Sequence, residues 1–289
     1  MHILSLFDGI SCGRVALERA NIPATTYYAS EIDPNAITVT QDNYPDTRQM
    51  GCVTGWKDWD IDWSKIDLLM GGSPCQGFST AGWQRGMDDP RSALFTVFVE
   101  ILDHIKSLNP DVKFLLENVP MKKEWLALIS GALDVPPVQI NSTLVSAQSR
   151  RRFYWTNIWE IAQPADLGLT MADIIDGPYW STRDKSYAIT ATYYKGSNFR
   201  RYFFKSGRQL VLENGYDPRP YLTDLEANDI ARADGSRYRT LTPEECEKLQ
   251  TLPVGYTSVI AAKTHRYHMI GNGWTVDVIA HILRPLAPP

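Results

Sequence analysis

Short apolar runs alternate with helical patterns along the first half of the chain. The runs predict buried strands, because the strands of a parallel sheet covered on both faces are continuously apolar. Apolar residues at three- and four-residue spacing between the runs predict helices, and Pro34 suits the first turn of one of them. The expected strands cover residues 2–7, 26–30, 66–70, 112–116, 140–145 and 153–155, and the expected helices cover residues 14–20, 34–44, 92–108 and 122–132.

This alternation predicts an α/β fold of Rossmann-like type, built on a mostly parallel sheet. After about residue 157 the segments become shorter and richer in Tyr, Phe, Gly and Arg, which predicts a smaller β-rich lobe. Apolar residues from Val276 to Leu286 share one helix face, and we expect that helix to pack on the first domain. The predicted domains are therefore residues 1–157 with 256–289, and an inserted lobe of residues 158–255.

Composition narrows the class of protein. The chain has 289 residues, of which 44% are hydrophobic, so it can bury a sizeable core. Its four cysteines form no Cys-x-x-Cys pair, which argues against a zinc ribbon or a disulfide framework. No signal sequence begins the chain and no apolar run reaches the roughly 18 residues of a membrane span. We expect a cytoplasmic protein.

Charge is unevenly distributed along the chain. The formal net charge is -4, which by itself does not suggest a nucleic-acid partner. Residues 150–210, however, contain ten basic and five acidic residues, so this segment carries a net charge of +5. A basic segment inside an acidic chain predicts one positive face, which is what a polyanion requires.

A glycine-bearing turn follows the first expected strand, and an acidic residue follows the second. Gly9 and Gly13 allow a ligand to approach the backbone at the start of a helix. Glu31 stands about twenty residues on, where an acid typically binds ribose hydroxyls. An ordinary turn with a solvated glutamate is the alternative. Turn and acid together favour an adenosine-bearing cofactor, and the spacing is not that of the NAD-binding pattern.

Cys75, preceded by Pro74, lies in the loop that follows the expected strand at residues 66–70. A thiol on a loop at such a strand end favours a nucleophile over a structural cysteine. Glu117 ends the next apolar strand and should lie at the same edge of the sheet, either as an acid–base residue or as an ion-paired or capping carboxylate.

Two basic segments follow. Arg150 and Arg152 stand at alternate positions before an aromatic strand, so we expect both to face the site and Arg151 to point outward. A solvated charge run is the alternative. Residues 195–208 contain five cations, no acid and interleaved aromatic residues, which favours phosphate and base contacts, with a β-hairpin that has one wet face as the alternative.

Six motifs stand in the order found in the DNA (cytosine-5) methyltransferases, and the chain resembles this family over essentially its full length. The six motifs are Phe7-x-Gly9 with Gly13, Gly72-Ser73-Pro74-Cys75-Gln76, Glu117-Asn118-Val119, Gln148-x-Arg150-x-Arg152, Arg239 to Cys246, and Gly271-Asn272-Gly273. Ser5 and Cys52 stand where members of the family often have aspartate, and the first motif is closest in wording to the de novo branch.

The resemblance implies an S-adenosylmethionine-dependent methyltransferase with a target-recognition lobe, no metal, double-stranded DNA as partner and no membrane. We expect a monomer, with oligomers left open, associated with the nucleoid of a bacterial cell or phage-infected host.

In the implied reaction Cys75 attacks C6 of a flipped cytosine, Glu117 binds or protonates N3, and the arginines bind the O2 side and a phosphate. The implied catalytic residues are Pro74, Cys75, Glu117, Arg150 and Arg152. The implied cofactor residues are Phe7, Gly9, Gly13, Glu31, Ile32 and Asn272. The implied DNA-binding residues are Gln76, Ser79, Arg91, Lys195, Arg200, Arg201 and Lys205.

Two alternatives remain open at this point. One branch of the family methylates cytosine in tRNA, but it carries a Cys-Phe-Thr tripeptide that this chain lacks. A catalytically silent DNA-binding paralogue would lose the nucleophile or the cofactor motif, and both are present here. The sequence leaves the target site open, and with it restriction–modification, viral self-masking and gene regulation as biological roles.

Overall fold

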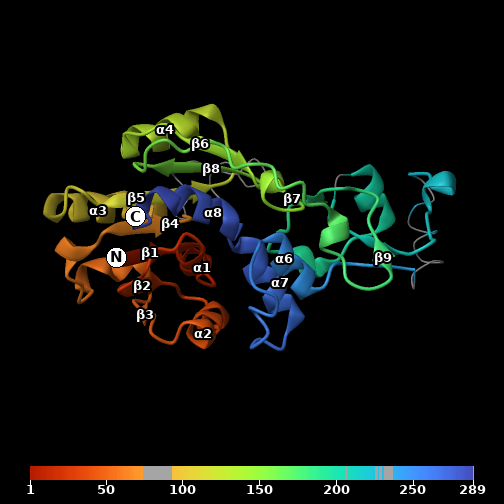
Figure 1. Cartoon of the computed structure of the whole chain (residues 1–289), viewed down its shortest axis with the longest axis horizontal. Coiled ribbons are helices and arrows are strands. Elements are labelled where there is room, and N and C mark those ends of the chain that lie inside the picture. Colours follow the sequence, from red (N-terminus) through yellow and green to blue (C-terminus); the bar gives the residue numbers. More distant parts are fainter. Residues whose placement is uncertain (74–92, 206, 225–226, 228–229, 231–236, 289) are drawn as a thin grey trace. The chain divides into compact units, whose positions relative to one another are not determined.

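The computed structural model describes residues 1–73, 93–205, 207–224, 227, 230 and 237–288 (Figure 1). The chain forms two compact units. The first comprises residues 1–141, 151–163 and 276–289, and the second comprises residues 142–150 and 164–275. None of the helices within the described part of the chain is long and apolar enough to span a membrane.

The first unit is built on a seven-stranded sheet in the order β3-β2-β1-β4-β5-β8-β6. All neighbouring strands in the run from β3 to β5 are parallel, and β8 runs antiparallel to both of its neighbours. This result confirms the predicted mostly parallel α/β sheet. The strands are β1 (His2–Leu6), β2 (Thr26–Ser30), β3 (Arg48–Gln49), β4 (Leu68–Gly71), β5 (Lys113–Asn118), β6 (Val138–Asn141) and β8 (Arg151–Thr156).

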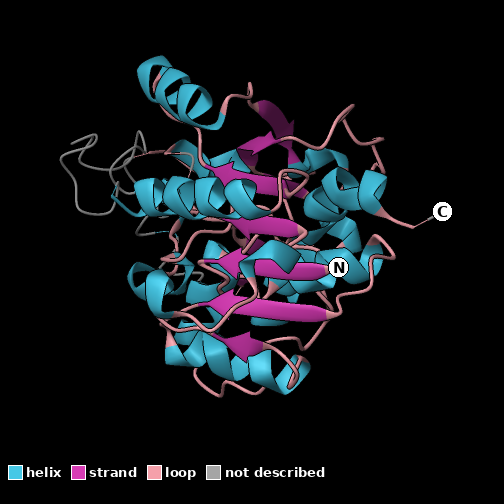
Figure 2. Ribbon diagram, turned by 90° about the vertical axis from the view of Figure 1, so that its left-hand side faces the viewer, coloured by secondary structure: helices cyan, strands magenta, loops and turns pink. Residues whose placement is uncertain are grey.

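Helices flank this sheet (Figure 2). Leu4 and Leu6 of β1 belong to a core cluster with Phe98 of α3, whereas Ile3, which points to the opposite face, is also fully buried. Both faces of the central strand are therefore covered, which explains its unbroken apolar sequence. The helices are α1 (Cys12–Arg19), α2 (Pro34–Asn43), α3 (Ala93–Leu108), α4 (Lys123–Leu133) and α8 (Val276–Leu283).

The C-terminal helix belongs to the first unit. Helix α8 packs on α1, and Arg19 of α1 forms an ion pair with Asp277 at 2.5 Å. The residues of α8 that are buried include Val276 and Ile279, as their spacing predicts. The last segment of the chain therefore completes the same layer of helices as the first helix.

The second unit has little regular structure. It contains a three-stranded antiparallel sheet, β9-β11-β12, and a two-stranded parallel pair of β7 and β10. Residues 193–204, where a hairpin was the alternative, instead form a 3-10 turn and a π-helical turn. The elements are β7 (Gln148–Ser149), β9 (Tyr179–Trp180), β10 (Ser186–Tyr187), β11 (Val211–Glu213), β12 (Tyr238–Arg239), α6 (Pro243–Leu249) and α7 (Lys263–Asn272).

The bounds of this unit differ from those of the predicted lobe, which ends at residue 255. Helix α7 follows that residue but packs on α6, and the Tyr267 hydroxyl donates to the Leu241 carbonyl at 2.7 Å. Thr242 caps α6 in a capping box with Glu245, as Thr-Pro-Glu-Glu suggests. The long-range contacts of α7 therefore assign residues 256–275 to the second compact unit.

Candidate active site at the carboxyl ends of the strands

The carboxyl ends of β1, β2 and β4 lie level with one another, and β5 extends two residues beyond them. Leu6 of β1 pairs with Ser30 of β2 and with Gly71 of β4, and Gly71 pairs with Leu116 of β5. The residues that follow these strands therefore emerge along one edge of the sheet. In open α/β sheets this is the edge at which ligands bind.

The turn after β1 has an unusual backbone. Phe7, Gly9 and Ser11 have φ angles of 56°, 59° and 56°, in the left-handed region that non-glycine residues rarely adopt. Glu31 holds this turn to the end of β2, because its carboxylate accepts hydrogen bonds from the N–H groups of Gly9, Ile32 and Asp33 at 2.7–2.8 Å. Two of the predicted cofactor residues, Gly9 and Glu31, are thus in direct contact.

The neighbouring Ile32 and Gly13 suit a bound adenosine group. The apolar side chain of Ile32 is 72% exposed, next to the Glu31 carboxylate, and could cover the face of a flat ring. Gly13 is buried at the start of α1, beside the backbone of the turn. An exposed apolar side chain next to an acid, at a strained glycine turn, fits an adenosine-bearing cofactor.

Asp8 occupies the middle of the turn, and sequence reasoning did not select it. Its carboxyl group accepts hydrogen bonds from the hydroxyls of Tyr27, at 2.7 Å, and Ser11. Ser11 in turn shares a hydrogen bond with Thr40 of α2 at 3.0 Å. Burial, with a smaller contribution from the nearby Glu31, raises the pKa of Asp8 to about 6, because the hydroxyl partners do not fully offset the loss of water.

Cys52 lies close to the same edge. The Ser30 hydroxyl donates to the Gly51 carbonyl at 2.7 Å, which holds this segment beside the end of β2. The Cys52 side chain is exposed, and its sulfur lies 3.1 Å from the Thr54 hydroxyl. This hydrogen bond lowers the pKa of the Cys52 thiol below its usual range.

A second contact joins the ends of β4 and β5. The side-chain amide of Asn118 donates to the carbonyl and the hydroxyl of Ser73, at 3.5 and 3.3 Å, and both residues are buried. Ser73 is the last described residue before the predicted nucleophile segment. The predicted site residues Pro74, Cys75, Gln76, Ser79 and Arg91 lie outside the described residues.

Glu117 and Arg152 form an ion pair on adjacent strands. Arg152 Nε lies 2.7 Å from Glu117 Oε1, and the two side chains are 15% and 11% exposed. Arg152 also donates through one terminal amino group to the Arg151 carbonyl at 2.7 Å. Its other terminal amino group has no partner among the described residues, so it remains available to a ligand next to the Glu117 carboxylate.

Arg150 does not lie on the same strand as Arg152, contrary to the expectation from their alternate positions. Strand β8 begins at Arg151, while Arg150 follows β7 in the second unit. The alternation of side chains holds only along one continuous strand, and the chain changes sheets between these two arginines.

The Arg150 guanidinium is buried among backbone carbonyls of the second unit. It donates to Ile189 at 2.8 Å, and to Gly271 and Gly273 at 3.1 and 3.0 Å. The last two carbonyls flank Asn272, another predicted cofactor residue. Arg150 therefore supports the turn that carries Asn272.

Two glutamine side chains complete this support. Gln148 accepts from the Ile189 N–H and donates to the Leu249 carbonyl, at 2.7 and 3.0 Å. Gln250 donates to the carbonyls of Ile270 and Gly273, at 2.8 and 3.1 Å. Gly271 must be a glycine, because a Cβ atom there would lie 2.2 Å from the Thr190 backbone.

The predicted DNA-binding residues of the second unit fall into two groups. Arg200 forms an ion pair with Asp224 at 2.8 Å. Lys195, Arg201 and Lys205 form no ion pair with any residue that the structure describes. The positive charge of residues 195–208 is therefore only partly neutralised by acidic residues of the described chain.

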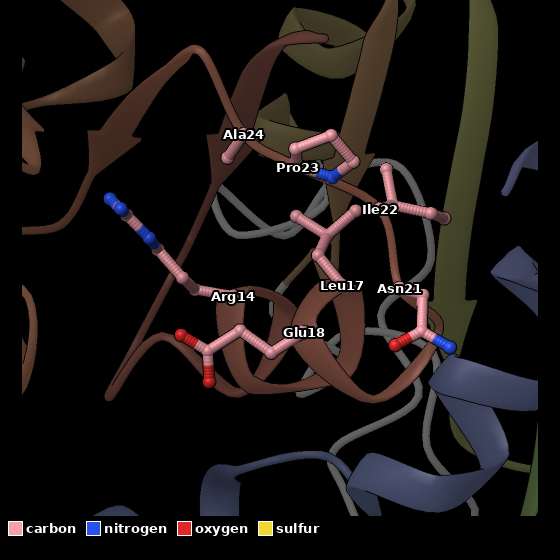
Figure 3. A pocket seen from close by; sticks show the side chains of 7 residues that line it. All are labelled: Arg14, Leu17, Glu18, Asn21, Ile22, Pro23 and Ala24. Carbon is pink, nitrogen blue, oxygen red and sulfur yellow. The ribbon is translucent and has the colours of Figure 1, made fainter. Parts of the chain in front are cut away.

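A separate depression of about 500 Å³ lies over helix α1. Figure 3 shows its lining, which includes Arg14, Leu17 and Glu18 of the helix and Pro23 of the following loop. None of its lining residues is a predicted site residue, and Arg14 and Glu18 already bind Asp46 and Tyr44. Within the described ranges no group of three His, Cys, Asp or Glu side chains is placed to hold a metal ion.

Replacing Asp8 should change the pH dependence of stability. The pKa of Asp8 is near 3.8 in the unfolded chain and about 6 in the folded protein, so its contribution to stability falls as the pH rises towards 6 and is lost above it. Between pH 5 and pH 7, the stability of the wild type should fall relative to Asp8→Asn by about 1 kcal/mol. Urea unfolding at several pH values measures this. Asp42→Asn, at an exposed position of α2, should show the wild-type slope, and equal slopes for all three proteins would contradict the assignment.

Removing the Arg150 side chain should destabilise the second unit. Arg150→Ala leaves the buried carbonyls of Ile189 and Gly271 without this donor, whereas Gly273 keeps its bond to Gln250, and the change should lower the free energy of unfolding by about 3 kcal/mol. Thermal and urea unfolding measure the loss. Arg151→Ala, which removes the adjacent exposed arginine, is the matched control and should cost less than about 0.5 kcal/mol. Comparable losses in the two variants would show that the Arg150 contacts do not support the fold.

Comparisons with known proteins agree with this architecture. The family described as "C-5 cytosine-specific DNA methylase" matches residues 1–124 and 144–287. The chain is 27% identical to the Type II methyltransferase M.Bsp6I of Bacillus sp. (strain RFL6), covering 98% of this chain and 97% of the relative. It is 26% identical to the Type II methyltransferase M.NlaX of Neisseria lactamica, covering 97% and 94%.

Solved structures show the same fold at low identity. A DNMT2 mutant from Spodoptera frugiperda aligns with a TM-score of 0.69 at 19% identity over 99% of both chains. The methyltransferase EhMeth of Entamoeba histolytica aligns with a TM-score of 0.74 at 17% identity over 99% of this chain and 98% of the other. Since the family match covers most of the chain and confirms the predicted resemblance, this protein is a member of the C-5 cytosine-specific DNA methylase family.

Proposed function

We propose that the protein transfers a methyl group from S-adenosylmethionine to C5 of a cytosine in double-stranded DNA, with Cys75 as the nucleophile. The observation that carries the proposal is the contact between Asn118 and Ser73 beside the Glu117–Arg152 ion pair. Ser73 precedes Cys75 by two residues, which span at most about 7 Å of chain. Chain connectivity therefore supports a thiol and a carboxyl group acting on one base.

In this proposal the protein's side chains make the cytosine ring reactive. S-adenosylmethionine supplies the methyl group. The Glu117 carboxyl group gives its proton to N3 as the Cys75 thiolate forms a bond to C6, and the other terminal amino group of Arg152 binds O2. After methylation, N3 returns its proton to Glu117, water takes the proton of C5, and the bond between sulfur and C6 breaks, which restores the thiolate. The 2.7 Å contact with Arg152 fixes the orientation of the Glu117 carboxyl group throughout.

The turn after β1 would hold the cofactor. Glu31 retains about one acceptor site for a ribose hydroxyl, since a carboxylate offers about four such sites and three of them accept backbone hydrogen bonds. Ile32 and Phe7 would contact the adenine ring, and Gly9, Gly13 and Asn272 would lie nearer the methionine end. These assignments follow the family motifs and the contacts of the turn.

A cytosine inside a duplex cannot reach such a site, so the target base must flip out of the stack. The second unit would then select the sequence. Lys195, Arg201 and Lys205 are the cations that we assign to the DNA backbone, because they form no ion pair in the described part of the chain, although the charge of Lys205 also acts on Asp224. Arg200 would first have to leave Asp224.

A methyl-transfer assay tests the substrate and the nucleophile together. The wild type should transfer tritiated methyl groups to double-stranded DNA and not to tRNA, whereas Cys75→Ala should reduce transfer at least about 1,000-fold and still bind S-adenosylmethionine. Cys52→Ala, which removes an exposed thiol, is the control and should keep activity on DNA. Transfer to tRNA alone would assign the protein to the RNA branch, and turnover by Cys75→Ala would exclude Cys75 as the nucleophile.

Replacing Glu117 separates its chemical role from its structural one. Glu117→Gln removes the charge and the transferable proton but keeps the shape, so single-turnover methylation should slow about 100- to 10,000-fold. The same variant should lose little stability if the neighbouring strands hold Arg152 in place. Unchanged single-turnover rates, measured in rapid-quench experiments, would remove Glu117 from the mechanism.

A further inference from the structure

Arg183 stands out among the arginines of the second unit. It lies in the turn between β9 and β10, is exposed, and places its guanidinium 4.2 Å from the centre of the Tyr187 ring. Its Nε donates to the Lys185 carbonyl at 3.3 Å. Neither terminal amino group has a partner among the described residues, so the outer edge of the guanidinium is open.

Three other arginines of this unit stack on aromatic rings, but carboxylates neutralise all of them. Ring stacking alone therefore does not distinguish Arg183, whereas the lack of a carboxylate does. The pairs are Arg219 on Trp180 with Asp217, Arg237 on Tyr216 with Glu213, and Arg239 on Tyr179 with Glu245.

The turn that carries Arg183 packs directly on the basic segment of residues 195–208. Tyr187 contacts the Tyr202 ring edge-on, with centroids 6.2 Å apart, and the Thr182 and Tyr202 hydroxyls are 2.8 Å apart. Tyr202 belongs to the π-helical turn Arg200–Phe204. Arg183 is thus part of the same packed assembly as Arg201 and its neighbours.

Hydrogen bonds join the two ends of the basic segment. Arg208 donates to the Gly196 carbonyl and the Thr192 hydroxyl, both at 2.8 Å, and the Tyr193 hydroxyl donates to the Gln209 carbonyl at 2.7 Å. These bonds join the two ends of the segment. The segment therefore presents its cations from a fixed frame instead of a free loop.

We infer that Arg183 is a nucleic-acid contact of this protein, with its open guanidinium edge binding a pair of acceptors on the substrate. The inference rests on the proposed function and adds a residue to it. The two acceptors are either O6 and N7 of a guanine or two oxygens of a backbone phosphate, which the same fork of donors fits. Stacking on Tyr187 holds the fork in place before binding, so little side-chain entropy is lost.

The test compares Arg183→Ala and Arg183→Lys with Arg237→Ala. The control residue stacks on its ring at the same 4.2 Å but is neutralised by Glu213. Bisulfite sequencing of DNA from cells that express each protein gives the methylated sequence. Fluorescence anisotropy over a range of salt concentrations gives the affinity for a duplex with that sequence and for a random duplex.

Either acceptor gives a distinct result. If Arg183 reads a guanine, both of its variants should lose about 10- to 100-fold in affinity for the target duplex and accept other bases at one position. If it binds a phosphate, Arg183→Ala should weaken binding to both duplexes equally and reduce the salt slope by about one, while Arg183→Lys should bind nearly as the wild type does.

The inference is overturned if Arg183→Ala binds both duplexes as the wild type does, or if Arg237→Ala loses as much affinity. Failure of the proposed function would look different, because the wild type would then leave no methylated cytosine in cellular DNA. Binding to the random duplex needs no methylation, so it tests Arg183 in that case as well.

Discussion

The alignment of parallel strand ends along one edge of the sheet is the constraint on which the rest of the candidate site depends. Since Leu6, Ser30 and Gly71 lie in one row, the chain leaves β1, β2 and β4 at the same height, and β5 extends two residues beyond Leu116 in that row. Gly71 permits this alignment, because a Cβ atom there would lie 3.0 Å from the Phe98 ring and 3.2 Å from the Leu6 carbonyl. A larger residue would separate β4 from α3 and displace the strand end that leads to the predicted nucleophile segment.

The three acids along this edge are held in different ways, and this difference separates their chemistry. Glu31 accepts three backbone N–H bonds, which stabilise a carboxylate and fix its direction. Glu117 is paired with a guanidinium. Asp8 is enclosed with hydroxyl groups as its hydrogen-bond partners, and burial raises its pKa to about 6. One strand edge thus carries a carboxylate fixed by backbone N–H groups, an ion-paired carboxylate and a buried acid with a raised pKa.

The sequence predicts the sheet and its edge well because both depend on local signals. Apolar runs ended by glycine, proline or an acid locate the strands, and parallel pairing then brings Glu31 and Glu117 to one side. Arg150 could not be assigned in this way. Its environment depends on Ile189 and Gly271, which are 39 and 121 residues away, and the chain changes sheets just after it. Asp8 was missed for a similar reason, since its raised pKa comes mainly from burial, which depends on how distant parts of the chain pack around the turn.

Net charge is a poor guide to the predicted positive face of this protein, because eight of the fifteen arginines that the structure describes already form ion pairs with acids. For Arg200, Arg219 or Arg237 to bind a phosphate, an existing ion pair must break, and the gain is only the difference between two similar contacts. A cation without a carboxylate replaces only water and counterions, so its binding releases counterions with no internal loss. A chain of net charge -4 can therefore bind a polyanion through a small set of residues, provided that the fold keeps its own acids away from them. The hydrogen bonds that join the ends of residues 195–208, and the stacking of Arg183 on Tyr187, hold these side chains in place.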